Sequence, residues 1–226
     1  MAMPTNHAIL SASSSHRWLE CPPSAKLCAE LPDTSSEYAQ EGTDAHALCE
    51  HRLKALLGRE TTDPTENLTY YNEEMERCAV EYATYAYEQV KKAKVACNDP
   101  IVLIEQKLDF SRWVPEGFGT GDCVIVADGT LSVIDFKYGK GVEVRAENNP
   151  QMMLYALGAL ELFDGIYDIS AVNMIIFQPR RDNISEYAIS KEELLRWANE
   201  ILTPTAQLAA NGDGDFKAGK HCRFCK

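Results

Sequence analysis

The chain has 226 residues, 45% of them hydrophobic and 25% charged, which is enough for one sizeable core and typical of an ordinary globular protein. It contains no uninterrupted apolar run long enough to cross a membrane, and residues 1–7 lack the charged and apolar regions of a signal peptide, so we expect a cytoplasmic protein with no membrane partner. The net charge of -12 argues against binding to nucleic-acid phosphates through overall basicity, although local basic patches can still do so.

The first 97 residues are expected to form a helical region. A short helix is predicted over residues 16–21, before a pair of prolines that cannot continue it. A second helix is predicted over residues 36–57, followed by a polar loop over residues 59–70. The spacing of apolar residues and an acidic first turn predict a third helix over residues 72–96.

The hydrophobic period then changes to that of strands, and residues 98–210 are expected to form an α/β core. The first strand is predicted over residues 101–104. A glycine-rich loop leads into a second strand over residues 123–127. The dipeptide Asp128-Gly129 is a strong hairpin signal, and a third strand returns over residues 131–137.

A helix is predicted from Pro150 to about Phe163, because proline is favoured in the first turn. An apolar strand follows over residues 172–177, and a capping box at Ser190 opens the last long helix. Residues 211–226 form a tail that carries cysteines. Helices, three strands, helix, strand and helix, in that order, predict one domain with an α/β fold and a mixed central sheet.

The hairpin places two aspartates face to face. With Asp128-Gly129 as a two-residue turn, opposed residue numbers sum to 257, so Asp122 lies opposite Asp135. Lys137 projects from the same face, since side chains alternate along a strand. Opposed β-carbons are about 4.5–5.5 Å apart. Two buried carboxylates at that distance repel each other, whereas a divalent cation between them would make the arrangement favourable.

Other interpretations of these residues remain open. Either aspartate alone can end a strand or accept backbone hydrogen bonds. A pair of carboxylates can also act as general acid and base, as in glycosidases, although Lys137 is then less naturally explained. Basic residues close in sequence can bind phosphate, but any one such group is more often a solvated surface. These groups are Lys137, Lys140 and Arg145; Arg180 and Arg181; and Lys217, Lys220, Arg223 and Lys226.

Further polar residues are candidates only in combination with the aspartates. His46 on an apolar helix face is more often packed or exposed than a ligand, and Glu41 more often caps or pairs locally. Glu105, in the strand before the hairpin, can face either the site or solvent. Gln151 and Tyr155 lie one helical turn apart on one face but are, taken alone, ordinary helix residues.

The ordered set Gly121-Asp122, Asp135-Phe136-Lys137 and a helix with Gln151 and Tyr155 resembles the PD-(D/E)XK nuclease superfamily. Within it, the chain looks like the RecB, AddB and Cas4-like branch, which has an N-terminal histidine and a split cysteine cluster. The segments SSSHRWLECP (13–22) and EGTDAH (41–46) are similar to phage and prophage proteins of the DUF2800 family. The likeness covers nearly the whole chain, and the ordered set is more specific than the Asp-x-Lys triplet alone.

The resemblance implies a role for each matching residue. His46, Asp122, Asp135 and the Phe136 carbonyl would bind Mg²⁺ or Mn²⁺, with Glu41 and Glu105 as possible supporting groups behind them. Lys137 would position or activate the attacking water. Gln151 and Tyr155 would orient Lys137 or the scissile phosphate.

The resemblance also implies that the cysteines near the two chain ends bind a [4Fe–4S] cluster, which usually takes four thiolates. Cys21, Cys222 and Cys225 match the pattern, and a further cysteine is expected beyond Lys226, so the tail is expected to be truncated and the cluster incomplete. His221 or Cys28 can substitute for the missing ligand, and zinc is the main competing metal. The remaining cysteines are expected to be small buried hydrophobes.

The sequence therefore predicts a metal-dependent DNase, an exonuclease that acts on linear single- or double-stranded DNA in phage recombination or replication, with phage proteins of those processes as further partners. One alternative is a catalytically inactive nuclease fold that binds nucleic acid or a phage protein, which the acidic net charge favours. Another is an interaction domain stapled by zinc at Cys222 and Cys225, with no metal between the aspartates.

Overall fold

The computed structural model describes residues 8–32 and 36–226. The segment 1–7, which is predicted to lack a signal peptide, lies outside the described residues. Among the helices described, none combines the length and the apolar composition that a membrane span requires.

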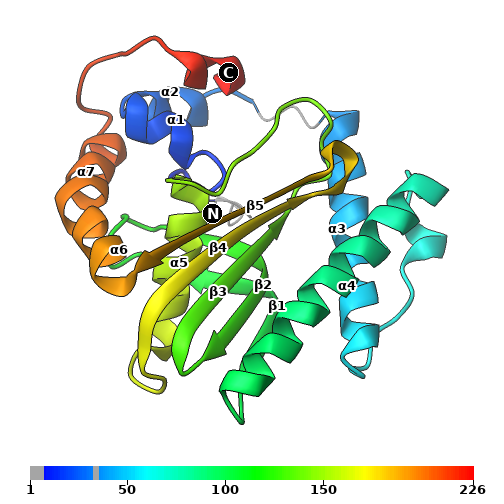
Figure 1. Ribbon diagram of the computed structural model, residues 1–226. Coiled ribbons are helices and arrows are strands. Elements are labelled where there is room, and N and C mark those ends of the chain that lie inside the picture. The colour runs from blue at the N-terminus through cyan, green and yellow to red at the C-terminus, as the bar shows by residue number, and fades with distance from the viewer. Residues whose placement is uncertain (1–7, 33–35) are drawn as a thin grey trace, which may run out of the picture.

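A single five-stranded sheet forms the centre of the molecule (Figure 1). Its strands are adjacent in chain order and antiparallel, except that β3 and β4 run parallel. The strands are β1 (Ile101–Asp109), β2 (Phe118–Ala127), β3 (Gly129–Phe136), β4 (Ile169–Gln178) and β5 (Asn183–Ser190). The prediction of an α/β fold with a mixed central sheet is confirmed.

The parallel pair requires a crossover, and α5 (Pro150–Phe163) supplies it. Asn149 caps this helix by accepting from the N–H groups of Gln151 and Met152, and Pro150 occupies its first turn. One face of α5 packs on the strand side chains Val124, Val126, Leu131 and Val133 in one hydrophobic core. Because α5 starts after β3 ends, its first turn lies near the carboxyl end of that strand.

The opposite face of the sheet is covered by α3 (Glu37–Leu56) and α4 (Glu73–Ala96), which lie on the other side from α5 in Figure 1. Ser36 and Asn72 cap the two helices through their side chains. Leu48, Leu53 and Tyr82 belong to a second core with the alternate strand residues Ile125, Ile134 and Phe136. A short 3-10 turn (Thr65–Asn67) interrupts the loop between the two helices.

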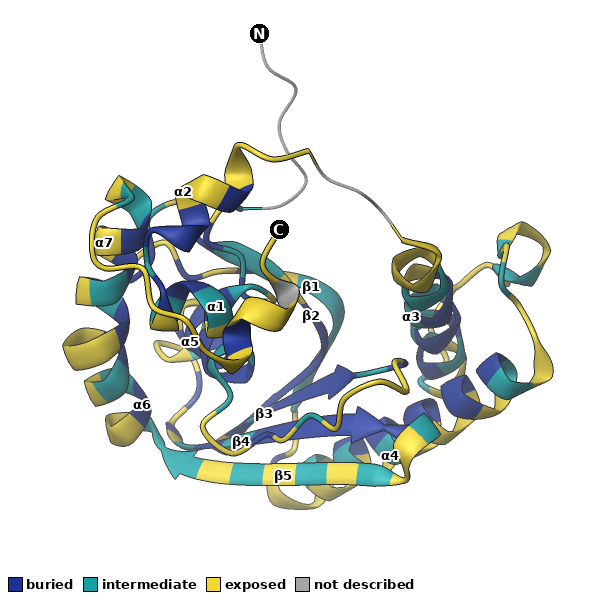
Figure 2. Cartoon of the chain, turned by 90° about the horizontal axis from the view of Figure 1, so that it is seen from above, coloured by how far each residue is buried: buried dark blue, intermediate teal, exposed yellow. Residues whose placement is uncertain are grey.

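The two ends of the described chain meet beside α5. Helices α1 (Ser15–Glu20) and α2 (Ser24–Ala29) pack against the C-terminal helix α7 (Thr203–Asn211), and the 3-10 helix η4 (Lys220–Phe224) lies next to α1 (Figures 1 and 2). Helix α6 (Lys191–Trp197) leads into α7 through a π-helical turn (Ala198–Leu202). The predicted capping box at Ser190 is present and begins α6.

Helix α2 and strands β1, β2 and β5 differ from the sequence prediction, and β1 continues to Asp109, beyond the predicted run of residues 101–104. Helix α2 was missed because it is only six residues long and follows two prolines. Strand β5 was missed because it lies at the sheet edge, where residues alternate between exposed and half-buried and no apolar run forms (Figure 2). Strand β2 begins at Phe118, so the expected loop glycines Gly119 and Gly121 lie inside it.

Both glycines mark close approaches of other side chains. A β-carbon on Gly119 would lie 2.7 Å from Cε1 of Tyr155, and one on Gly121 would lie 2.9 Å from Cδ1 of Leu108. Glycine inside a strand often marks such a contact. The absence of a side chain at position 119 therefore allows Tyr155 to reach the end of the sheet.

Candidate functional site

The predicted register of the hairpin is confirmed. Cys123 pairs with Ile134 and Ala127 with Thr130, so each opposed pair sums to 257. The next position places Asp122 opposite Asp135, and both aspartates are buried. The backbone N–H of Phe136 donates to Oδ2 of Asp122 at 2.6 Å across the two strands. The carboxylate pair is thus held by backbone that the register fixes.

A third carboxylate extends this row onto β1. Ile104 pairs with Cys123 and Gln106 with Gly121, so Glu105 lies opposite Asp122. Opposed residues on antiparallel strands project from the same face. Glu105 has a φ of 50°, an uncommon conformation for a residue other than glycine. Such local strain in a strand is often found at functional sites.

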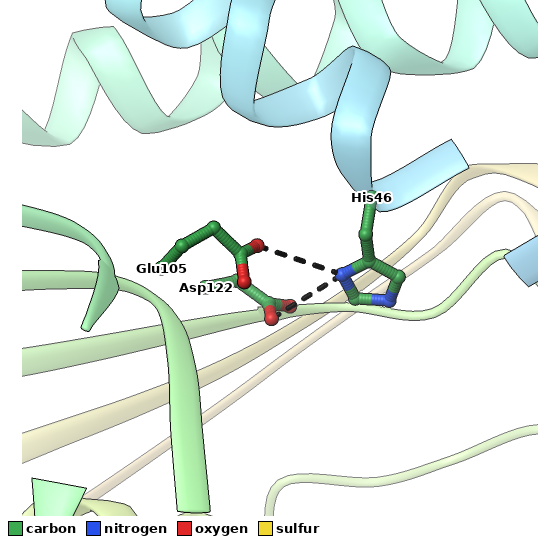
Figure 3. Close-up of side chains that lie close together, drawn as sticks. All are labelled: His46, Glu105 and Asp122. Carbon is green, nitrogen blue, oxygen red and sulfur yellow. Dashed lines mark ion pairs between the residues drawn. The ribbon is translucent and has the colours of Figure 1, made fainter. Parts of the chain in front are cut away.

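His46 approaches the same carboxylates from helix α3. Its Nδ1 lies 3.3 Å from Oδ1 of Asp122 and 3.9 Å from Oε1 of Glu105 (Figure 3). The three side chains each offer one ligand atom, and these atoms all lie within 4.8 Å of one another. Carboxylate oxygens with one imidazole are a suitable donor set for Mg²⁺ or Mn²⁺. We use the name metal centre for this candidate site, which consists of His46, Glu105 and Asp122.

The electrostatics of the metal centre fit a divalent cation. Burial and the nearby charge of Asp122 raise the pKa of Glu105 to about 7. Burial alone would lower the pKa of His46, but the Asp122 carboxylate outweighs it and raises that pKa to about 9. Burial and Asp122 also raise the pKa of Asp135. Glu105 therefore keeps its proton to a higher pH than an exposed glutamate does, and a bound cation would displace that proton.

Asp122 shows the opposite shift because its partners are stronger. Burial would raise its pKa, but the His46 imidazolium and the Phe136 N–H together lower it. Asp122 is therefore the residue of the row that is held ionised. Asp122 contacts His46 and lies opposite Glu105, so it is the central residue of the three possible ligands.

Lys137, Gln151 and Tyr155 form a hydrogen-bonded chain next to Asp135. The Nζ of Lys137 lies 2.9 Å from Oδ2 of Asp135 and donates to Oε1 of Gln151 at 3.0 Å. The Nε2 of Gln151 donates to Oδ1 of Asp135 at 3.2 Å and to the Tyr155 hydroxyl at 3.0 Å. Apart from its ion pair with Lys137, the buried Oδ2 of Asp135 accepts no hydrogen bond from the described residues. That oxygen can therefore accept a further ligand.

The two predicted supporting carboxylates are placed differently. Glu105 contacts His46 directly as part of the metal centre. Glu41 pairs with Arg180, whose Nη1 lies 3.3 Å from its Oε1, while Nη2 of Arg180 reaches Glu74 at 2.9 Å. The Arg180 guanidinium also stacks over the Tyr138 ring at 4.2 Å. Glu41 thus joins α3 to the end of β4 through Arg180.

The predicted cysteine ligands lie where the chain ends meet. Cys21 accepts from the Lys217 N–H at 3.5 Å, and Cys222 accepts from the Gly219 N–H at 3.3 Å. Cys28, considered only as a substitute ligand, lies closest to a second thiol, with its Sγ 3.7 Å from that of Cys225. Among the described residues, no three cysteine or histidine ligand atoms at this end lie within 4.8 Å of one another. His221 is buried, and its Nε2 lies 2.8 Å from the Lys217 carbonyl oxygen.

Sequence reasoning underestimated Glu105, and it named Arg180 only with Arg181 as a possible basic group, not as a partner of Glu41. The signal for Glu105 was available, because extending the register to β1 places it opposite Asp122. Arg180 had no such signal, since its partners Glu41 and Glu74 are more than one hundred residues away in sequence. Only the packing of α3 and α4 on the sheet brings these groups together.

A family model described as "Protein of unknown function (DUF2800)" matches residues 7–226. The chain belongs to the DUF2800 family. The resemblance of the segments around Trp18 and His46 to DUF2800 proteins is thereby confirmed.

Two solved structures share a more distant likeness with this DUF2800 chain. A crystal structure described as "Putative exonuclease", from Eubacterium rectale, has a TM-score of 0.47 and 11% identity, and the match covers 96% of this chain and 88% of that chain. A crystal structure described as SSO0001 has a TM-score of 0.31 and 15% identity, and the match covers 79% of this chain and 91% of that chain.

Proposed function

We propose that this DUF2800 protein is a metal-dependent nuclease of the PD-(D/E)XK type that hydrolyses phosphodiester bonds in DNA. The row of carboxylates Glu105, Asp122 and Asp135 on adjacent strands carries the proposal, because Lys137 is hydrogen-bonded into its end. An ordinary structural ion pair joins one cation to one carboxylate. Three crowded carboxylates with a histidine and a lysine instead match the needs of metal-assisted phosphoryl chemistry.

In this proposal, His46, Glu105 and Asp122 would hold Mg²⁺ or Mn²⁺, with Asp135 and the Phe136 carbonyl as further ligands. The bound cation would supply an acidic water and would offset negative charge on the phosphoryl oxygens. Lys137 would orient the attacking water and donate to a phosphate oxygen. Its side chain is half-buried and anchored at both Asp135 and Gln151, so little ordering remains to be done on substrate binding.

Gln151 and Tyr155 act as positioning residues. The Gln151 amide uses its oxygen for Lys137 and its two N–H donors for Asp135 and Tyr155. This arrangement fixes which end of the amide faces the lysine. Replacing Gln151 with glutamate would put an anion beside Asp135 and remove both donors.

Within this reaction we propose an exonuclease acting in phage recombination or replication, which the likeness of the segments 13–22 and 41–46 to phage and prophage proteins supports. The test is an assay with Mn²⁺ on end-labelled linear and circular DNA, both single- and double-stranded. We expect wild-type protein to release label from linear DNA, and the Asp135→Ala variant to release none. Cleavage of linear DNA by Asp135→Ala at the wild-type rate would overturn the assignment.

The net charge of -12 favours a second candidate, a nuclease fold without turnover that binds nucleic acid or a protein partner. This candidate predicts Mn²⁺ binding at the metal centre but no cleavage of any DNA or RNA substrate. The anchored position of Lys137 favours the nuclease, because a fold that only binds does not need a lysine held against Asp135.

We also propose that Cys21, Cys222 and Cys225 bind a [4Fe–4S] cluster, with Cys28 as the fourth thiolate in this chain. The distance of 3.7 Å between Cys28 and Cys225 supports the choice of Cys28 over His221, whose ring is engaged with a backbone carbonyl. Anaerobic purification should give a brown protein with iron and sulfide bound. Stoichiometric zinc in place of iron would instead support the zinc-stapled alternative.

A further inference from the structure

A groove opens directly beside Lys137 and Gln151. It has a volume of about 800 Å³. Residues 142–149, between β3 and α5, form one wall, and residues 13–16 and 219–223, from the two ends of the chain, form the other. Segments far apart in sequence therefore enclose a groove that starts at the lysine of the proposed active site.

The groove is positively charged in an acidic protein. Its lining carries four permanent cations against two carboxylates, whereas the whole chain has 22 Lys and Arg against 34 Asp and Glu. The cations are Lys137, Arg145, Lys220 and Arg223, and the carboxylates are Glu143 and Glu147. Glu143 and Arg145 are paired with each other at 3.3 Å, and Lys137 is paired with Asp135 at 2.9 Å, so the excess of positive charge comes from the lining residues of η4. A local positive potential that opposes the net charge marks a place for an anionic ligand.

The two basic residues of η4 are placed to meet that anion. Lys220 and Arg223 are both exposed. The ammonium of Lys220 has no hydrogen bond or ion pair with any described residue. An exposed lysine in this condition can contact a phosphate without losing an existing partner. Lys137, at the inner end of the same groove, lies at the proposed site of hydrolysis.

The size of the groove favours one strand over two. A volume of about 800 Å³ lies within the range of about 300–1,000 Å³ for small-ligand pockets, which matches a few nucleotides of one strand better than the width of a duplex. No tryptophan, tyrosine or phenylalanine of the described residues lines it, so base stacking contributes little there. Contacts to phosphates, which do not depend on sequence, would supply the affinity.

We propose that this groove binds a single strand of DNA next to the scissile phosphate, with Arg145, Lys220 and Arg223 contacting its phosphates. The inference rests on the proposed nuclease function only in taking Lys137 as the end of the groove at which the strand is cut. It goes further by naming the strand state of the substrate and the segment at the C-terminal end that holds it.

The test is the salt dependence of binding to a fluorescent oligothymidylate, measured by anisotropy with EDTA present so that no strand is cut. The groove variant carries Lys220→Ala and Arg223→Ala. The matched control carries Lys92→Ala and Lys94→Ala on the exposed side of α4, which lowers the total charge by the same amount. Each phosphate contact to a single strand contributes about 0.7 to the slope of log affinity against log salt. We therefore expect the slope of the groove variant to fall by about 1.4 and that of the control to be unchanged.

Arg145→Ala on the opposite wall provides a second variant that does not depend on the fold of η4, and its slope should fall by about 0.7. Equal slopes for the wild type, the groove variant and Arg145→Ala would overturn the inference. Tighter binding of a duplex of the same length, weakened equally by these substitutions, would overturn the single-strand assignment. If the groove variants lose binding but the wild type cleaves nothing with Mn²⁺, the groove stands and the nuclease proposal fails. If the wild type cleaves and the groove variants match the control, the nuclease stands and the groove proposal fails.

Discussion

The metal centre and the cysteine-bearing chain ends are both candidate metal sites, but they are built differently. At the metal centre, each ligand comes from a regular element, and two register relations place Glu105, Asp122 and Asp135 in one row. At the chain ends, Cys222 and Cys225 are exposed. Cys222 lies in the 3-10 helix η4, and Cys225 directly follows it. Preorganised donors suit catalysis, whereas exposed thiols depend on a bound metal to order them.

The largest expected effect is a loss of DNA cleavage on replacing Lys137, which distinguishes this residue from the nearby Lys140. Lys137→Ala should reduce the rate of DNA cleavage by about 10²–10⁴-fold, the usual contribution of a positioned proton-transfer or electrostatic group. Mn²⁺ affinity should be retained, because Lys137 is not a ligand. Lys140→Ala is the matched control, since Lys140 pairs with Glu74 at 3.0 Å, and it should cleave at the wild-type rate. Steady-state cleavage rates and calorimetric Mn²⁺ titrations give both readouts.

The second prediction distinguishes the two carboxylates that the sequence grouped together. Glu105→Gln should weaken Mn²⁺ binding by at least about 10–100-fold, the cost typical even of an outer-shell partner. Glu41→Gln should leave Mn²⁺ affinity unchanged and lower the melting temperature slightly, because Glu41 pairs with Arg180. Equal losses of Mn²⁺ affinity in both variants would contradict the assignment of Glu105, and not Glu41, to the metal centre.

The third prediction concerns pH. The pKa of Glu105 is raised to about 7 and that of His46 to about 9, so both groups hold protons near pH 6. In the metal-free protein, the stabilisation from these raised values is present at low pH and is lost as the pH rises through about 7 for Glu105 and about 9 for His46.

Metal binding must displace these protons, so it becomes more favourable as the pH rises. The increase in melting temperature on adding Mg²⁺ should therefore be larger near pH 8 than near pH 6. Differential scanning fluorimetry with and without the metal measures it. A larger increase near pH 6 would show that protonated His46 and Glu105 do not compete with the cation.

The smallest expected effect on Mn²⁺ affinity comes from a substitution at the chain ends. Cys28→Ser should abolish binding of iron or zinc there, yet change Mn²⁺ affinity at the metal centre by less than about twofold, because the thiols belong to a separate part of the fold. Elemental analysis and calorimetry measure the two quantities. Cys49→Ser is a suitable control, since Cys49 is buried in the core between α3 and α4. Loss of Mn²⁺ binding in Cys28→Ser alone would show that the two sites are coupled.

Sequence reasoning succeeded where periodicity and turn chemistry act locally. The Asp128-Gly129 turn and the alternation of the flanking strands were enough to place Asp122 opposite Asp135, and the structure confirms that register. Pro150 and the capping box at Ser190 likewise indicated two helix starts, and the structure confirms both. Family resemblance, and not spacing, brought His46, Gln151 and Tyr155 into the account.

The remaining features depend on tertiary packing. Strand β5 lacks an apolar run because it lies at the sheet edge, where its residues alternate between exposed and half-buried and none is fully buried. The groove beside Lys137 is assembled from residues near positions 15, 145 and 220, which no local pattern relates to one another. The basic group Lys217, Lys220, Arg223 and Lys226 was visible in the sequence, but its position next to the active site was not.

The most direct test of the metal centre is the anomalous scattering of Mn²⁺ in a crystal of the wild-type protein. The account predicts one strong peak within about 2.0–2.3 Å of Asp122 and His46, with Glu105 or Asp135 completing the protein ligands. An Asp122→Asn crystal should lack that peak. Full Mn²⁺ occupancy elsewhere in the wild type, with Asp122 and His46 still paired to each other, would contradict the central claim.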